Sequence, residues 1–182
     1  MTIPADERAR LLSLARSAVA AAVCGEPRPS VDDPGGVLGE RRGCFVTLTN
    51  AGRLRGCIGT FQPAKPLGEM IVEMGQAAAG DPRFVTDPIT PAELDQLTVQ
   101  VSVLSPLTPT DQPANLTVGQ HGIYVVSGHR SGCFLPEVAT DQGWTAEQFL
   151  TYCCATKAGL PPDAWKDPAT TVYLFTSEKF DH

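Results

Sequence analysis

The segment CFVTLTNAGRLRGCIGTF, residues 44–61, decides the fold of this chain. Two apolar-rich runs, 44–49 and 53–61, flank a short turn that contains Asn50 and Gly52. This pattern predicts a β-hairpin. The second strand is expected to end near Gly59, because proline has no backbone N–H to donate and QPAKP follows at residues 62–66.

Hydrophobic periodicity predicts the elements on both sides of this hairpin. Apolar residues three and four apart indicate amphipathic helices, alternating ones indicate strands, and capping boxes at Thr90–Glu93 and Thr145–Gln148 indicate helix starts. The predicted helices cover 11–25, 66–79, a short stretch from 91, and 146–158; the further strands cover 97–104, 122–126, 133–135 and 170–175. The order of these elements predicts an α+β fold with mainly antiparallel sheets and packed helices.

The 182 residues are expected to form a single domain. Its Pro-rich connector, residues 105–117, is the best candidate for a boundary between lobes. The apolar N-terminal run looks like part of a signal peptide, but Arg16 interrupts it and the acidic Asp6 and Glu7 precede it, so a docked helix is predicted instead. No run is long and apolar enough to predict a membrane span.

The composition narrows the function classes. Lys and Arg number 14 against 20 Asp and Glu, a net charge of −6, which disfavours nucleic acid as a partner. The six cysteines are not spaced as zinc ligands, so reduced thiols and a cytoplasmic location are expected. No phosphate loop, dinucleotide fingerprint or nucleophile-elbow serine is found, and the sequence identifies neither a metal site nor a cofactor.

Cys57 is the first candidate for chemistry. Strand alternation would place Arg53, Arg55 and Cys57 on one face, where the cations could favour a thiolate. Gly56 and Gly59 would let a ligand or backbone N–H groups approach. The alternative is that Cys57 fills the core and the glycines allow a helix to pack closely.

Other candidates lie at the ends of predicted elements. In GDPRF, residues 80–84, Asp81 could orient Arg83 as a fork for a carboxylate or phosphate, or Arg83 could simply complement the end of a helix. His121, between Gly119 and Gly122, could be a general base or a hydrogen-bonded turn residue. Glu137 could orient such a base or complement the start of a helix.

Five segments together resemble the AMMECR-one domain family, whose bacterial and archaeal members are called protein A of the AmmeMemoRadiSam system. These segments are LRGCIGTF (54–61), DPRF (81–84), HGI (121–123), LPEVATDQGW (135–144) and KAGLPPDAW (157–165). The resemblance extends from about Phe45 to Phe175. It implies two unequal, interlocked lobes with a cleft near residues 54–59, and as partners a Memo-like protein and a radical SAM enzyme. It implies no established reaction.

Two main hypotheses follow. In the first, Cys57 is a nucleophile in a modification pathway, His121 its base and Glu137 the orienting acid, while Arg55, Gly56, Gly59, Thr60, Asp81 and Arg83 bind the ligand. In the second, the chain is a non-catalytic module that binds a partner protein, a peptide or a small anion. Nucleic-acid binding near Arg53, Arg55 and Arg83 ranks third because of the acidic charge balance.

Overall fold

The computed structural model describes residues 2–181. The chain divides into two compact units, one made of residues 1–104 with 178–182 and the other of residues 105–177. Each unit contains a four-stranded sheet. The first unit is therefore formed by two segments of the chain, and the second unit is inserted in the sequence between these segments.

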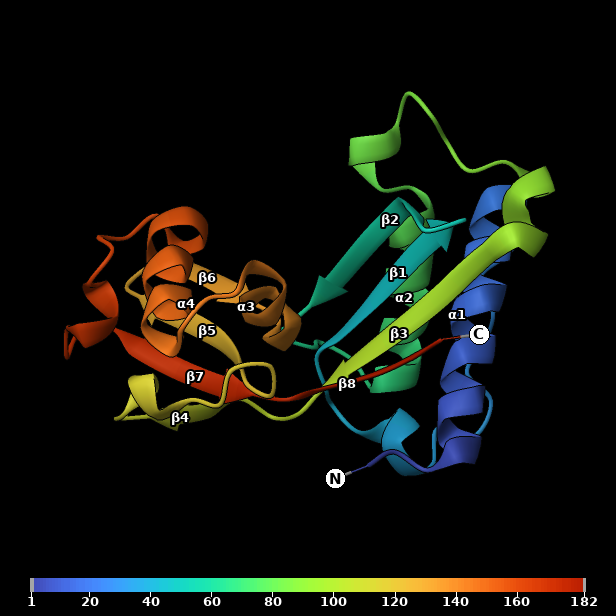
Figure 1. The fold of residues 1–182 in the computed structure, drawn as a ribbon. Coiled ribbons are helices and arrows are strands. Elements are labelled where there is room, and N and C mark those ends of the chain that lie inside the picture. Colours follow the sequence, from blue (N-terminus) through green and yellow to red (C-terminus); the bar gives the residue numbers. More distant parts are fainter. Residues whose placement is uncertain (1, 182) are drawn as a thin grey trace. The chain divides into compact units, whose positions relative to one another are not determined.

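In the first unit two helices cover one face of the sheet (Figure 1). The strand order is β2-β1-β3-β8, so β2 is an edge strand. The elements are α1 (Ala5–Cys24), β1 (Cys44–Asn50), β2 (Arg53–Thr60), α2 (Leu67–Ala79), β3 (Leu97–Leu104) and β8 (Ser177–Asp181), with short 3₁₀ helices at Gly36–Gly39, Pro82–Phe84 and Pro91–Gln96.

Alternation along the central strands explains the core of this unit. Val46 and Leu48 of β1 are buried and pair with Val101 and Val99 of β3, so all four side chains face the helices. Thr47, between them, points to the opposite face of the sheet. The face away from the helices thus carries Thr47 and Thr49 of β1.

The second unit is built in the same manner from a shorter stretch of chain. Its strand order is β4-β7-β5-β6, and helices supply the rest of an apolar core that includes Ile123, Phe149 and Leu150. The elements are β4 (Thr108–Thr110), β5 (Gly122–Ser127), β6 (Arg130–Phe134), α3 (Pro136–Gln142), α4 (Ala146–Tyr152), a π-helical turn at Cys153–Ala158, and β7 (Thr171–Phe175), with 3₁₀ turns at Pro113–Asn115 and Ala164–Lys166.

These elements confirm the predicted α+β fold, both hairpins and the two long helices α1 and α2. The helix predicted over 146–158 is a short α-helix that continues as a π-helical turn. Two strands were missed: β4, which contains a proline, and β8, whose charged sequence SEKFD has no apolar alternation. The capping box at Thr90 starts a 3₁₀ helix rather than an α-helix. Within residues 2–181 no helix is long and apolar enough to cross a membrane.

Candidate functional site

A β-bulge in β2 changes the expected arrangement of its side chains. The register shifts so that Gly56 pairs with Leu48 and Leu54 with Thr49, which leaves Arg55 as the extra residue. Cys57 pairs with Thr47 and therefore shares a face with Leu54.

Arg53 lies on the other face, because its partner Asn50 follows Thr49 in β1. The prediction that Arg53, Arg55 and Cys57 line up on one face is therefore wrong. Simple alternation fails wherever a strand contains an extra residue.

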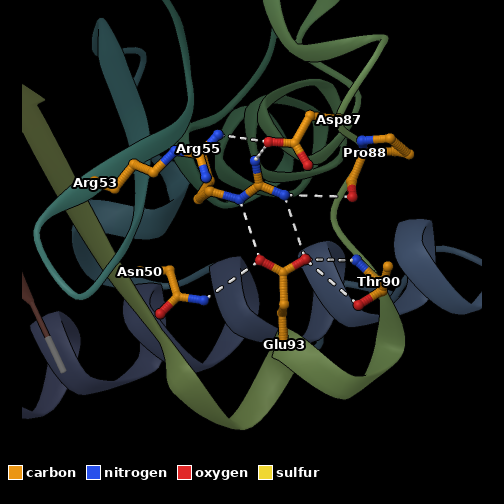
Figure 2. Close-up of polar contacts among 7 residues, drawn as sticks. All are labelled: Asn50, Arg53, Arg55, Asp87, Pro88, Thr90 and Glu93. Carbon is orange, nitrogen blue, oxygen red and sulfur yellow. Dashed lines mark hydrogen bonds and ion pairs between the residues drawn. The ribbon is translucent and has the colours of Figure 1, made fainter.

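Arg55 lies in a closed polar cluster with Asp87 and Glu93 (Figure 2). Its side chain is 3% exposed. Nε donates to Glu93 Oε1 at 3.2 Å and Nη2 to Glu93 Oε2 at 3.3 Å, a bidentate pair. Nη1 donates to Asp87 Oδ2 at 2.9 Å, and Nη2 also reaches the carbonyl of Pro88. The guanidinium of Arg55, which was expected to bind a ligand, is thus occupied by groups of the protein itself.

Glu93 connects this cluster to two other elements. Its carboxylate accepts from the backbone N–H of Thr90 at 3.0 Å and from the side-chain amide of Asn50 at 3.3 Å. The hydrogen bond from Thr90, followed by that from Arg55, holds the pKa of Glu93 below its ordinary value. Arg55 and Glu93 together fasten the segment after α2 to the hairpin, which is a structural role.

Asp81 and Arg83 bind the outer edge of β2 at Cys57. Asp81 Oδ2 accepts from the Cys57 N–H at 3.0 Å, and Arg83 Nη2 donates to the Cys57 carbonyl at 3.1 Å. The two side chains also pair with each other, Nη2 to Oδ2 at 2.6 Å. Asp81 thus holds Arg83 in place at the edge of β2, and anion binding by Arg83 stays a prediction. We call these residues the Asp81–Arg83 pair.

The contacts within this pair favour the ionised forms of both side chains. The hydrogen bond from Arg83 and those from the backbone N–H groups of Cys57 and Arg83 hold the pKa of Asp81 far below its ordinary value, against the effect of burial. The pKa of Arg83 is raised mainly by Asp81, with a smaller electrostatic contribution from the Cys57 thiol. Arg83 is thus a cation close to Cys57, and its side chain is 56% exposed.

The Cys57 thiol is half-buried on the sheet face that points away from α2. Its Sγ lies 3.1 Å from Thr47 Oγ1, the hydroxyl of its cross-strand partner. Burial raises the pKa of Cys44 to about 12 and also raises the pKa of Cys133, Cys153 and Cys154. All six cysteines are free. Cys57 is thus partly exposed, whereas Cys44 is buried in the core.

Packing explains both glycines of the motif. A Cβ on Gly56 would lie 2.0 Å from the carbonyl oxygen of Ala78 in α2, and one on Gly59 would lie 2.2 Å from the ring of Phe45. The Thr60 hydroxyl is engaged locally by the backbone of Gln62. Ligand binding by these residues stays a prediction, and their observed contacts are structural.

His121 and Glu137 belong to the second unit. His121 Nδ1 accepts from the backbone N–H of Thr117 at 2.9 Å, so it is a hydrogen-bonded turn residue. Glu137 lies in the first turn of α3, where an acid complements the helix. Their proposed roles toward Cys57 stay predictions.

Four residues of the site could not be found by scanning for motifs. Thr47, Asp87 and Glu93 lie 10, 32 and 38 positions from their partners in β2, and Asn50 is the last residue of β1. The capping box at Thr90–Glu93 was the only sequence signal that involved one of these residues. It indicated that Glu93 caps a helix and gave no sign of its contact with Arg55. No group of three or more potential ligand residues that could hold a metal ion occurs in the described part of the chain.

Fold and site together define an α+β protein with a partly exposed thiol on a braced edge strand. The family model AMMECR1 matches residues 12–180, and the chain belongs to this family. A protein of Methanothermobacter thermautotrophicus is 45% identical over 183 residues, covering 96% of this chain and 94% of that one. One of Thermococcus gammatolerans is 46% identical over 155 residues, covering 79% and 74%.

A solved structure has the same fold. It is the crystal structure of the uncharacterized protein PH0010 from Pyrococcus horikoshii, with a TM-score of 0.81 and 39% identity. The similarity covers 94% of this chain and 89% of that chain. The family resemblance inferred from the motifs is therefore confirmed.

Proposed function

We propose that this chain acts in a modification pathway through the thiol of Cys57. One observation supports this above all: both outward backbone groups of Cys57 are held by the Asp81–Arg83 pair, while its Sγ stays half-buried beside the Thr47 hydroxyl. A reactive group gains from being held in one position before its substrate arrives. A cysteine that only fills space needs no such support at its backbone.

Arg83 replaces Arg55 as the proposed activating cation. Arg55 is enclosed by carboxylates, whereas Arg83 is more than half exposed and interacts electrostatically with the thiol. A cation near a cysteine favours the thiolate, which is the nucleophilic form. His121 as base and Glu137 as orienting acid complete the proposal, together with the cleft that the family resemblance implies.

Alkylation kinetics test the proposal directly. Cys24 is an exposed thiol in the same chain and serves as an internal control. Iodoacetamide should modify Cys57 faster than Cys24 even though Cys57 is less exposed, as followed by peptide mass spectrometry. Arg83→Gln should slow the reaction of Cys57 several-fold and leave that of Cys24 unchanged. A Cys57 rate at or below the Cys24 rate would refute activation of this thiol.

The second candidate is a binding module without catalysis. It is favoured by the enclosure of Arg55, whose side chain is already bound to Asp87 and Glu93. The proposed partners are a Memo-like protein and a radical SAM enzyme. Co-purification with these two proteins separates the candidates: a binding module should retain them after Cys57→Ser and lose them after Arg83→Ala. Loss of pathway activity by a folded Cys57→Ser variant that still binds both would favour catalysis.

A further inference from the structure

A cavity of about 490 Å³ lies within the first unit, formed by the loop before β1 and by the start of α2. Val31, Leu38 and Val72 give it an apolar lining, and Arg28, Lys65 and Glu69 are its charged residues. Its volume is within the range of about 300–1,000 Å³ typical of small-molecule sites. An apolar lining with a few charged groups is the usual composition of such sites.

The loop that forms one wall is fixed to the helices beside it. Arg10 of α1 donates to the carbonyls of residues 32 and 33, and Glu7 of α1 accepts from the backbone N–H of Val37. On the other side a Cβ on Gly68 of α2 would lie 2.9 Å from Val31 Cγ1, so the loop packs tightly on that helix. The cavity is therefore formed before any ligand binds.

Two cations, Arg28 and Lys65, and two acids, Glu69 and Glu73, lie in and beside the cavity. Lys65 Nζ donates to Glu73 Oε2 at 2.7 Å, and Glu69 lies in the first turn of α2, where an acid complements the helix. The pKa of Glu73 is lowered first by the hydrogen bond from Lys65 and further by the charge of Arg28. Within residues 2–181 Arg28 donates no hydrogen bond. Arg28 is thus a cation with free donors at the rim of an apolar cavity.

We propose that this cavity binds an organic carboxylate that has an apolar body. The carboxylate would accept from the Arg28 guanidinium, whose parallel N–H groups match its two oxygens. The apolar body would lie against Val31, Leu38 and Val72. Two sources have this chemistry, a small free acid and the C-terminal residue of a peptide. The site shares no lining residue with the surroundings of Cys57 and does not depend on the function proposed for that thiol.

Calorimetric titration of the full chain tests this site with two pairs of probes. Octanoate is compared with octanamide, and a short peptide that ends in leucine is compared with the same peptide amidated at its C-terminus. Each acid should bind measurably tighter than its amide. Tighter binding of octanoate would identify a small acid as the source, and tighter binding of the peptide would identify a chain terminus. Equal binding of acid and amide in both pairs would overturn the proposal.

Three substitutions of similar size locate the binding charge. Arg28→Gln should weaken binding of the acids about tenfold, the effect of one charge-assisted hydrogen bond. Glu69→Gln, which removes a nearby negative charge, should tighten it about twofold. Arg130→Gln, an exposed arginine of the second unit, should have no effect. An Arg28→Gln variant that binds like the wild type would refute the assignment, and shifts of the amide resonances of Val31 and Val72 on adding octanoate would support it.

Discussion

Three arginines near the hairpin differ in exposure, and this difference decides what each can do. Arg55 is 3% exposed and bound to two carboxylates, Arg53 is 68% exposed and shares only Asp87, and Arg83 is 56% exposed beside Cys57. All three are ordinary surface cations by sequence. Their partners come from distant parts of the chain. These partners alone distinguish Arg55, which has a structural role, from Arg83, which is accessible.

Replacement of Arg55 by lysine should loosen the segment after α2. Lysine keeps the charge but cannot form the bidentate contact with Glu93, so one or more donors of the cluster are lost. We expect faster amide hydrogen exchange over residues 87–96 and a loss of about 2 kcal/mol in the free energy of unfolding. Arg53→Lys is the control, since that exposed side chain should tolerate the change. Equal effects of the two substitutions would contradict a structural role specific to Arg55.

Asp81 should contribute to the acid sensitivity of the fold. Its pKa is depressed in the folded state, so its contribution is complete above the unfolded value of about 3.9 and is lost as the pH falls toward the folded value. Asp81→Asn should cost about 2 kcal/mol at neutral pH. Its free energy of unfolding in urea should also decline less steeply than that of the wild type between about pH 5 and pH 2. Parallel declines would show that Asp81 is not a main source of the acid sensitivity.

At the scale of elements, hydrophobic periodicity predicts most helices and strands of the fold, but it does not predict the arrangement of the site. The apolar spacing in α2 and the alternation in β3 are local signals, and both elements lie where they were predicted. The bulge at Arg55 has no local signal, because it depends on how β2 pairs with β1. A shift of one residue moves side chains to the opposite face, which is why the grouping of Arg55 with Cys57 failed.

The contact between β2 and α2 should tolerate no side chain at residue 56. In Gly56→Ala the new Cβ would collide with the Ala78 carbonyl, so α2 must move, at a cost of about 3 kcal/mol. Gly80→Ala is the matched control, because its Cβ would lie 3.9 Å from the nearest neighbouring atom, Gln76 O. Urea unfolding should therefore show a large loss for Gly56→Ala and little change for Gly80→Ala. A small loss at residue 56 would mean that the helix can yield.

At the scale of the whole molecule, the last strand belongs to the first unit. β8 joins the sheet beside β3, and Glu178 accepts from the backbone N–H of Ile3 at 2.9 Å. A chain that ends at Ser177 should therefore lose stability in residues 1–104 and leave residues 105–177 intact. Hydrogen exchange measured over both units checks this outcome. Loss of protection in residues 105–177 instead would contradict the division of the chain.

The inserted unit begins and ends at one point, since Ser105 N–H donates to the Thr176 carbonyl and Thr176 N–H to Ser105 Oγ. During synthesis on the ribosome the chain emerges from its N-terminus. The sheet of the first unit is complete only when residues 178–181 have left the exit tunnel. Residues 105–177 emerge from the tunnel before them. The part of the protein that is made first is thus the part that finishes folding last, and until then β3 presents an open edge to other nascent chains.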